Sequence, residues 1–193
     1  MSGAAGEYMI ILETEETTQA LASFLARQAG AGDAILLSGP LGAGKSVLAR
    51  AFLRAFCQAP DMEVPSPTYT LVQPYAAPAC TVHHFDLWRL GGPDELDELG
   101  WDDARDGLVL VEWPERLEDL TPPDALHVTL DVRPDGVRVA HLRGWAGRFD
   151  AQALRAAGFE PAPAVQAASE GLWGPHGTDE TASGASAPDG ARD

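Results

Sequence analysis

The sequence predicts a three-layer α/β domain with a mixed, mainly parallel central sheet and antiparallel hairpins. Residues 34–37 and 108–111 are uninterrupted apolar runs, which are typical of strands that helices cover on both faces of a parallel sheet. A glycine-rich loop over residues 39–46 follows the first run and precedes a segment with helical apolar spacing. A strand, a glycine-rich loop and a helix in this order are typical of phosphate-binding α/β proteins.

The loop has the sequence Gly-Pro-Leu-Gly-Ala-Gly-Lys-Ser and matches the P-loop pattern G-x-x-x-x-G-K-[ST]. In this pattern the backbone N–H groups cradle phosphates, the lysine reaches the β- and γ-phosphates and the hydroxyl ligates Mg²⁺. Lys45 is the only lysine of the chain, and a planar guanidinium cannot replace its compact ammonium. Lys45 and Ser46 therefore predict a P-loop NTPase that binds a nucleotide and Mg²⁺.

The first half of the chain supplies the remaining elements in order. A strand is expected over residues 8–12, followed by a helix that Thr14 caps and Gly30 stops. The helix after the P-loop should turn Arg50 and Arg54 toward solvent, because they lie off its apolar stripe. Prolines make a loop of residues 65–67.

The second half of the chain alternates hairpins with short helices. Strand-like runs at 69–75 and 81–85 predict a hairpin, and runs at 126–132 and 137–142 predict another around a Pro-Asp-Gly turn. A short acidic helix should begin at Pro93 and end at Gly100, and a last helix should cover residues 148–157.

Length and composition predict one domain and a tail. Residues 1–158 read as the P-loop domain, and residues 159–193, rich in Ala, Gly, Ser, Pro and acidic residues, as a disordered tail with the isolated Trp173. The formal net charge of −16 makes the chain a poor nucleic-acid binder by itself. Two cysteines give no disulfide framework. We see no signal peptide and no membrane-spanning run, so we expect a cytoplasmic protein.

Polar residues at predicted strand ends are candidates for the site, because ligands of open α/β sheets bind beyond the carboxyl ends of the strands. Glu112 follows an apolar strand and could bind Mg²⁺ or orient a water molecule. Asp86 is equally compatible with a metal or water ligand and with an ordinary loop residue. The Ser-Pro-Thr segment at residues 66–68 could be a switch, although its spacing favours a rigid proline turn. Arg89 fits a phosphate-neutralising role or a surface ion pair.

Four segments together resemble the TsaE (YjeE) family over roughly residues 8–145. They are the P-loop at 39–46, Ser-Pro-Thr-Tyr at 66–69, His-Phe-Asp-Leu-Trp-Arg-Leu at 84–90 and Glu-Trp-Pro-Glu at 112–115. The resemblance implies a small P-loop fold, weak intrinsic ATP hydrolysis and Mg²⁺ as cofactor. It also implies action with a TsaD–TsaB heterodimer in threonylcarbamoyladenosine modification of tRNA, so that tRNA is contacted only indirectly.

The resemblance also implies roles for individual residues. Lys45, Asp86 and Glu112 carry over as catalytic, and Ser46 and Glu112 as Mg²⁺ ligands. The nucleotide-binding positions that it implies are Gly39, Leu41, Gly42, Ala43, Gly44, Lys45, Ser46, Val47, Thr68 and Trp113. The chain departs from the family pattern at Pro40, at Ser46, where threonine is usual, and at Trp88, where tyrosine is common.

Two other functions use the same loop and stay open at this point. A small-molecule kinase would have an arginine-rich lid, whereas the arginines here are spread singly along the chain. A non-hydrolysing ATP sensor would bind the nucleotide and change the shape of its partner. Phosphate transfer to a metabolite would identify the first, and binding without turnover the second.

Overall fold

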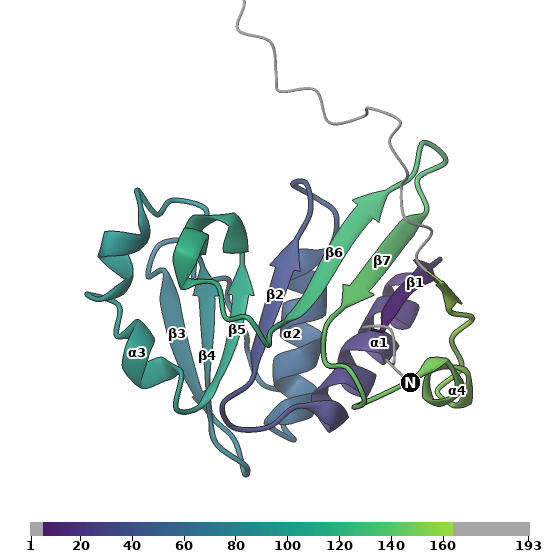
Figure 1. The fold of residues 1–193 in the computed structure, drawn as a ribbon, viewed down its shortest axis with the longest axis horizontal. Coiled ribbons are helices and arrows are strands. Elements are labelled where there is room, and N and C mark those ends of the chain that lie inside the picture. Colours follow the sequence, from purple (N-terminus) through teal and green to yellow (C-terminus); the bar gives the residue numbers. More distant parts are fainter. Residues whose placement is uncertain (1–5, 164–193) are drawn as a thin grey trace, which may run out of the picture.

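The computed structural model describes residues 6–163 and shows one eight-stranded sheet in the order β3-β4-β5-β2-β6-β7-β1-β8 (Figure 1). The four central strands, β4, β5, β2 and β6, are parallel to one another. The outer strands pair antiparallel. The predicted class, a mixed α/β sheet with parallel strands at its centre, is confirmed.

The strands have the following bounds: β1 (Glu7–Leu12), β2 (Ala34–Ser38), β3 (Val72–Ala76), β4 (Thr81–Asp86), β5 (Leu108–Glu112), β6 (Leu126–Val132), β7 (Arg138–Arg143) and β8 (Ala162–Pro163). The two fully apolar runs of the sequence are β2 and β5, which lie side by side in parallel register. The hairpin predicted around residues 134–136 joins β6 to β7.

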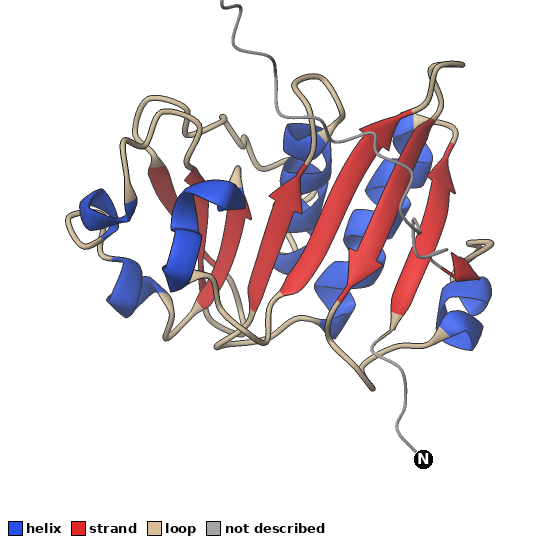
Figure 2. Cartoon of the chain, turned by 45° about the horizontal axis from the view of Figure 1, so that its top comes forward, coloured by secondary structure: helices blue, strands red, loops and turns tan. Residues whose placement is uncertain are grey.

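Helices form a layer on each face of the sheet (Figures 1 and 2). On one face, α1 (Glu15–Gln28) and α2 (Lys45–Phe56) pack against each other and cover the middle of the sheet. On the other face lie three short helices, η1 (Pro93–Leu96), α3 (Trp101–Ala104) and η2 (Pro114–Leu120). The short α4 (Ala151–Ala156) follows the second hairpin, and its Leu154 is buried in the same apolar cluster as residues of α1.

The two faces of the sheet bury two separate apolar clusters. The larger cluster contains Leu37, Leu48 and Phe52 and lies between the sheet and the α1–α2 pair. The smaller contains Leu36, Phe85 and Trp101 and lies under the short helices. Because neighbouring residues of β2 face opposite clusters, all four apolar residues of this strand are buried, as the uninterrupted run predicts.

Two predicted elements in the middle of the chain have wrong boundaries. β3 begins at residue 72 rather than 69, because the N–H of Leu71 donates to the carbonyl of Pro67 and Leu71 has a φ of 63°. The acidic helix does not run from Pro93 to Gly100. It breaks after Leu96, and Gly100 precedes α3 in a left-handed conformation.

Two further predictions are corrected: the solvent exposure of two side chains of α2, and the start of the last helix. Arg50 and Arg54 of α2 are half-buried and donate to the carbonyls of Val64 and Met62, respectively. The last helix begins at residue 151 rather than 148, because the carboxylate of Asp150 accepts from the N–H of Ala153 and caps it.

The packed chain also extends past the predicted domain boundary at residue 158. Phe159 is buried in the larger cluster, and β8 pairs with β1. The rest of the predicted tail, including Trp173, lies outside the described residues. No helix within residues 6–163 has the length and apolar character needed to cross a membrane.

An ion pair between Asp33 and Arg148 lies at the start of β2. Asp33 is buried and accepts from the N–H of Gly30 and from both terminal nitrogens of Arg148, with Nη2–Oδ1 at 2.6 Å. This hydrogen bonding raises the pKa of Arg148 above its usual value. The pair joins the segment before α4 to the loop that precedes β2.

We expect Asp33→Ala to lower the free energy of unfolding by about 1–3 kcal/mol, because three donors lose a charged acceptor. Urea denaturation followed by circular dichroism measures the change. The matched control is Asp124→Ala, which removes an exposed carboxylate 4.0 Å from Arg105 and should cost less than about 1 kcal/mol. Equal losses of unfolding free energy in the two variants would show that the Asp33–Arg148 pair stabilises the fold no more than the exposed Asp124–Arg105 pair does.

Candidate nucleotide-binding site

The P-loop leaves β2 and enters α2 in a conformation that requires glycine at two points. Gly39 has a φ of 130° and lies so close to the backbone of β6 that a Cβ would collide with the carbonyl oxygen of Leu130. Gly44 has a φ of 107° and immediately precedes α2, and no side chain caps the N–H groups that follow. The first turn of α2 therefore presents free N–H donors and its positive dipole end to the loop.

The ammonium of Lys45 lies inside the curve of its own loop. Its Nζ donates to the carbonyls of Gly39 at 2.6 Å and Pro40 at 2.9 Å, and lies 3.9 Å from the centre of the Trp113 ring. Burial lowers the pKa of Lys45, while the nearby carboxylates of Glu112, Glu115 and Asp86 oppose this shift. The ammonium has neutral carbonyls as its only hydrogen-bond acceptors among the described residues, so it is available to a phosphate anion.

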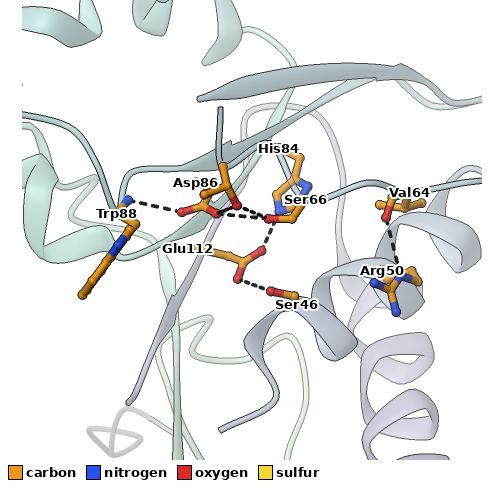
Figure 3. A network of polar contacts seen from close by, with 9 residues as sticks. Ser46, Arg50, Val64, Ser66, His84, Asp86, Trp88 and Glu112 are labelled. Carbon is orange, nitrogen blue, oxygen red and sulfur yellow. Dashed lines mark hydrogen bonds and ion pairs between the residues drawn. The ribbon is translucent and has the colours of Figure 1, made fainter. Parts of the chain in front are cut away.

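Glu112 ends β5 beside the P-loop and is 2% exposed. The parallel register pairs it with Leu37 of β2 on one side and with Asp86 of β4 on the other. Its Oε2 accepts from the hydroxyl of Ser46 at 2.9 Å, and its Oε1 lies 2.9 Å from Nε2 of His84 (Figure 3).

Asp86 ends β4 and organises the loop between α2 and β3. Its Oδ2 accepts from the hydroxyl of Ser66 at 3.1 Å, and its Oδ1 accepts from the N–H of Trp88 at 3.2 Å (Figure 3). Oδ2 also accepts from the hydroxyl of Thr68 at 2.9 Å. The structure thus joins the Ser-Pro-Thr segment directly to a carboxylate at the strand ends. The segment forms the turn that its prolines predicted, and this turn also lies beside the P-loop.

These groups line one cavity of about 410 Å³. Its lining includes the predicted residues Leu41, Gly42, Gly44, Lys45, Ser46, Val47, Thr68, Asp86, Glu112 and Trp113. Two predicted nucleotide-binding residues do not line it. The side chain of Ala43 is buried in the larger cluster, and Gly39 packs against β6 while accepting the lysine hydrogen bond.

A second hollow of about 430 Å³ lies between α1 and α2 and is lined by Glu15, Arg50 and Arg54, among others. Val47 lines both cavities. Every other predicted site residue that lines a cavity lines the one beside the P-loop. The strand ends and the P-loop meet only at the first cavity, so we place the site there.

Three cavity-lining or contacting residues were not assigned to the site from the sequence: His84, Trp88 and Arg138. Ser66 and Arg89, whose roles the sequence left open, also line the cavity, and the Arg89 guanidinium lies 4.9 Å from the centre of the Tyr69 ring. His84 could have been found, because it lies two residues before Asp86 and hence on the same face of the strand. No pattern in the sequence pointed to Arg138 as a site residue. It begins β7, far from every motif, and its side chain lies against Gly44 only through the packing of the second hairpin.

The oxygen donors of this cavity suit Mg²⁺, which proteins bind through one or two side chains, better than a metal that protein ligands surround completely. Within residues 6–163 no three His, Cys, Asp or Glu side chains are grouped to hold a metal ion. Mg²⁺ in nucleotide sites is held by one or two protein oxygens, with phosphate and water completing the shell. The hydroxyl of Ser46 beside the carboxylate of Glu112 is a donor set of that kind.

The fold and the loop geometry define a P-loop NTPase-like protein. Comparisons with known proteins identify the family: residues 12–139 match the model of TsaE, described as "Threonylcarbamoyl adenosine biosynthesis protein TsaE". The chain belongs to the TsaE family.

Individual relatives agree with this assignment. The chain is 38% identical to the tRNA threonylcarbamoyladenosine biosynthesis protein TsaE of Rickettsia felis over 135 residues, which cover 69% of this chain and 78% of that protein. It is 30% identical to the protein of the same name from Bacillus subtilis, over 70% of this chain and 84% of that one. The crystal structure of Bacillus subtilis YdiB has the same fold, with a TM-score of 0.61 and 23% identity over 81% of this chain and 97% of that chain.

We expect Thr68→Val to loosen the loop over residues 66–71, because Asp86 loses one of its two hydroxyl donors there. Hydrogen–deuterium exchange should show faster exchange of the Leu71 amide, which is bonded to Pro67 in this loop. Thr70→Val is the matched control, since Thr70 is exposed in the same loop and its hydroxyl makes no hydrogen bond among the described residues. Unchanged exchange in Thr68→Val would contradict the link between Asp86 and the loop.

Proposed function

We propose that this protein binds and hydrolyses ATP with Mg²⁺ and supports threonylcarbamoyladenosine modification of tRNA. The observation that carries the ATPase proposal is the convergence of Lys45, Ser46 and Glu112 at one cavity beyond the carboxyl ends of β2 and β5. Membership of the TsaE family, whose relatives bear the name tRNA threonylcarbamoyladenosine biosynthesis protein, supports the biological setting.

Each residue of the cavity has a role in this proposal. The N–H groups of Gly42 and of Gly44 to Ser46 cradle the phosphates, and Lys45 exchanges its carbonyl acceptors for the β- and γ-phosphate oxygens. Ser46 and Glu112 would hold Mg²⁺, which when bound neutralises phosphate charge.

Two further groups complete the site. Asp86 ties the loop at Thr68 to the strand end and places an acceptor near the water that attacks the γ-phosphate. The ring of Trp113 covers the lysine and limits the access of solvent.

The charge of the chain supports an indirect connection to RNA. A formal net charge of −16 opposes phosphate-backbone binding, so the tRNA is held by partners. The partner in this proposal is a TsaD–TsaB-like heterodimer in the cytoplasm. ATP hydrolysis resets that partner between turnovers and transfers no phosphate to a substrate. Variants that cannot hydrolyse ATP and still support many rounds of modification would contradict the resetting role.

The decisive experiment measures phosphate release from MgATP with and without the heterodimer. We expect slow release alone and strong stimulation by the pair, and we expect Glu112→Gln to lower the stimulated rate at least about 100-fold while ATP binding persists. The control, Asp119→Asn, changes an exposed carboxylate on η2 and should leave the rate unchanged.

The other outcomes identify the other functions. ATP binding without stimulated release would favour a sensor that changes the shape of its partner. Phosphate that appears on a metabolite rather than in solution would favour a kinase. Loss of ATP binding in Lys45→Ala together with full phosphate release in Glu112→Gln would contradict the proposed role of Glu112.

A further inference from the structure

His84 is a buried ionisable side chain for which the proposed mechanism has no use. It lies on β4, is 1% exposed, and its imidazole Nε2 is 2.9 Å from Oε1 of Glu112 (Figure 3). Alternation along the strand places it on the same face as Asp86, two residues later. The register pairs Asp86 with Glu112, so His84 approaches the Glu112 carboxylate from inside the domain, away from the cavity that Asp86 lines.

The Glu112 carboxylate is held from two sides, with one partner at each oxygen. Oε1 is bonded to His84 and Oε2 to the hydroxyl of Ser46. A carboxylate buried to this degree must be hydrogen-bonded to remain ionised at low cost. Because His84 occupies Oε1, only Oε2 is directed toward the P-loop.

The hydrogen bonding also assigns the tautomer of His84. An ionised carboxylate can only accept, so Nε2 carries the proton and donates to Glu112. Nδ1 has no hydrogen-bond partner among the described residues. An unprotonated Nδ1 there is an acceptor without a donor, whereas a proton on it would bury an unpaired N–H, which proteins avoid more strongly. The neutral Nε2–H tautomer fits this environment.

We propose that His84 is a positioning residue for the reaction: by binding Oε1 it fixes the rotation of the Glu112 carboxylate and keeps Oε2 directed at Ser46 and the phosphate cavity. This inference rests on the proposed ATPase function. Removing a group that hydrogen-bonds a metal-ligating carboxylate, the role proposed here for Glu112, typically lowers metal affinity or activity 10- to 100-fold. A histidine that only filled space in the core would affect stability but not this orientation.

The test compares two substitutions of His84. His84→Leu keeps the volume approximately and removes the donor, and it should lower the kcat for partner-stimulated hydrolysis by about 10-fold or more while the Kd for ATP changes by no more than about 2-fold. His84→Gln offers an amide N–H at a similar reach and should restore most of the kcat. Leu and Gln variants with equal kcat would overturn the proposal.

A control exists outside the cavity. His141 of β7 lies 3.6 Å from the carboxylate of Asp131, so it forms a second His–carboxylate pair, half-exposed, that does not border the site. His141→Leu should leave kcat unchanged. A fall in kcat as large as that of His84→Leu would show a general effect of losing such pairs and would overturn the positioning role.

A second readout does not depend on turnover. Long-range ¹H–¹⁵N correlation spectra of the imidazoles should show His84 as the Nε2–H tautomer with a slowly exchanging proton, and Glu112→Ala should make that proton exchange rapidly. An Nδ1–H tautomer, or fast exchange in the unsubstituted protein, would overturn the inference. If the spectra agree but the unsubstituted protein releases no phosphate with its partner, the proposed function fails and the kinetic role of His84 fails with it, while the His84–Glu112 contact stands.

Discussion

The site depends on the register of three parallel strands, β4, β5 and β2. Because these strands end at the same level, Asp86 and Glu112 are direct neighbours, and Glu112 is also paired with Leu37 just before the P-loop begins. A shift of one residue in either pairing would turn a carboxylate to the opposite face of the sheet. Backbone hydrogen bonds just past the strand ends hold this register: the N–H of Trp113 donates to the carbonyl of Leu37, and the N–H of Leu87 donates to the carbonyl of Glu112.

Glu112 connects the strand register to the side chains of the site. It connects the P-loop through Ser46 to the inside of the domain through His84, and it contributes to the charge that faces Lys45. The lysine, in contrast, is held by carbonyls that a phosphate can replace without breaking any tertiary contact. The arrangement therefore separates a rigid carboxylate from a cation that can change partners, which is the preorganisation that phosphoryl chemistry requires.

Local patterns predicted the parts of the molecule that local physics decides. The apolar runs, the glycine-rich loop and the Thr14 cap predicted β2, β5, the P-loop and the start of α1. The carboxylates at the strand ends followed from the direction of parallel strands. The break after Leu96 was missed, because tertiary packing of short helices on the smaller cluster decides it. The position of Arg138 against Gly44 depends on how the second hairpin packs, and no spacing in the sequence encodes that.

In the proposed mechanism Ser46 of α2 and Glu112 of β5 act as one unit. A double-mutant cycle with Ser46→Ala, Glu112→Gln and the combined variant, measured as kcat/KM for partner-stimulated ATP hydrolysis, tests it most directly. The account predicts strong non-additivity: the double variant should be about as impaired as the worse single variant. Losses in kcat/KM that multiply as for independent sites would contradict it.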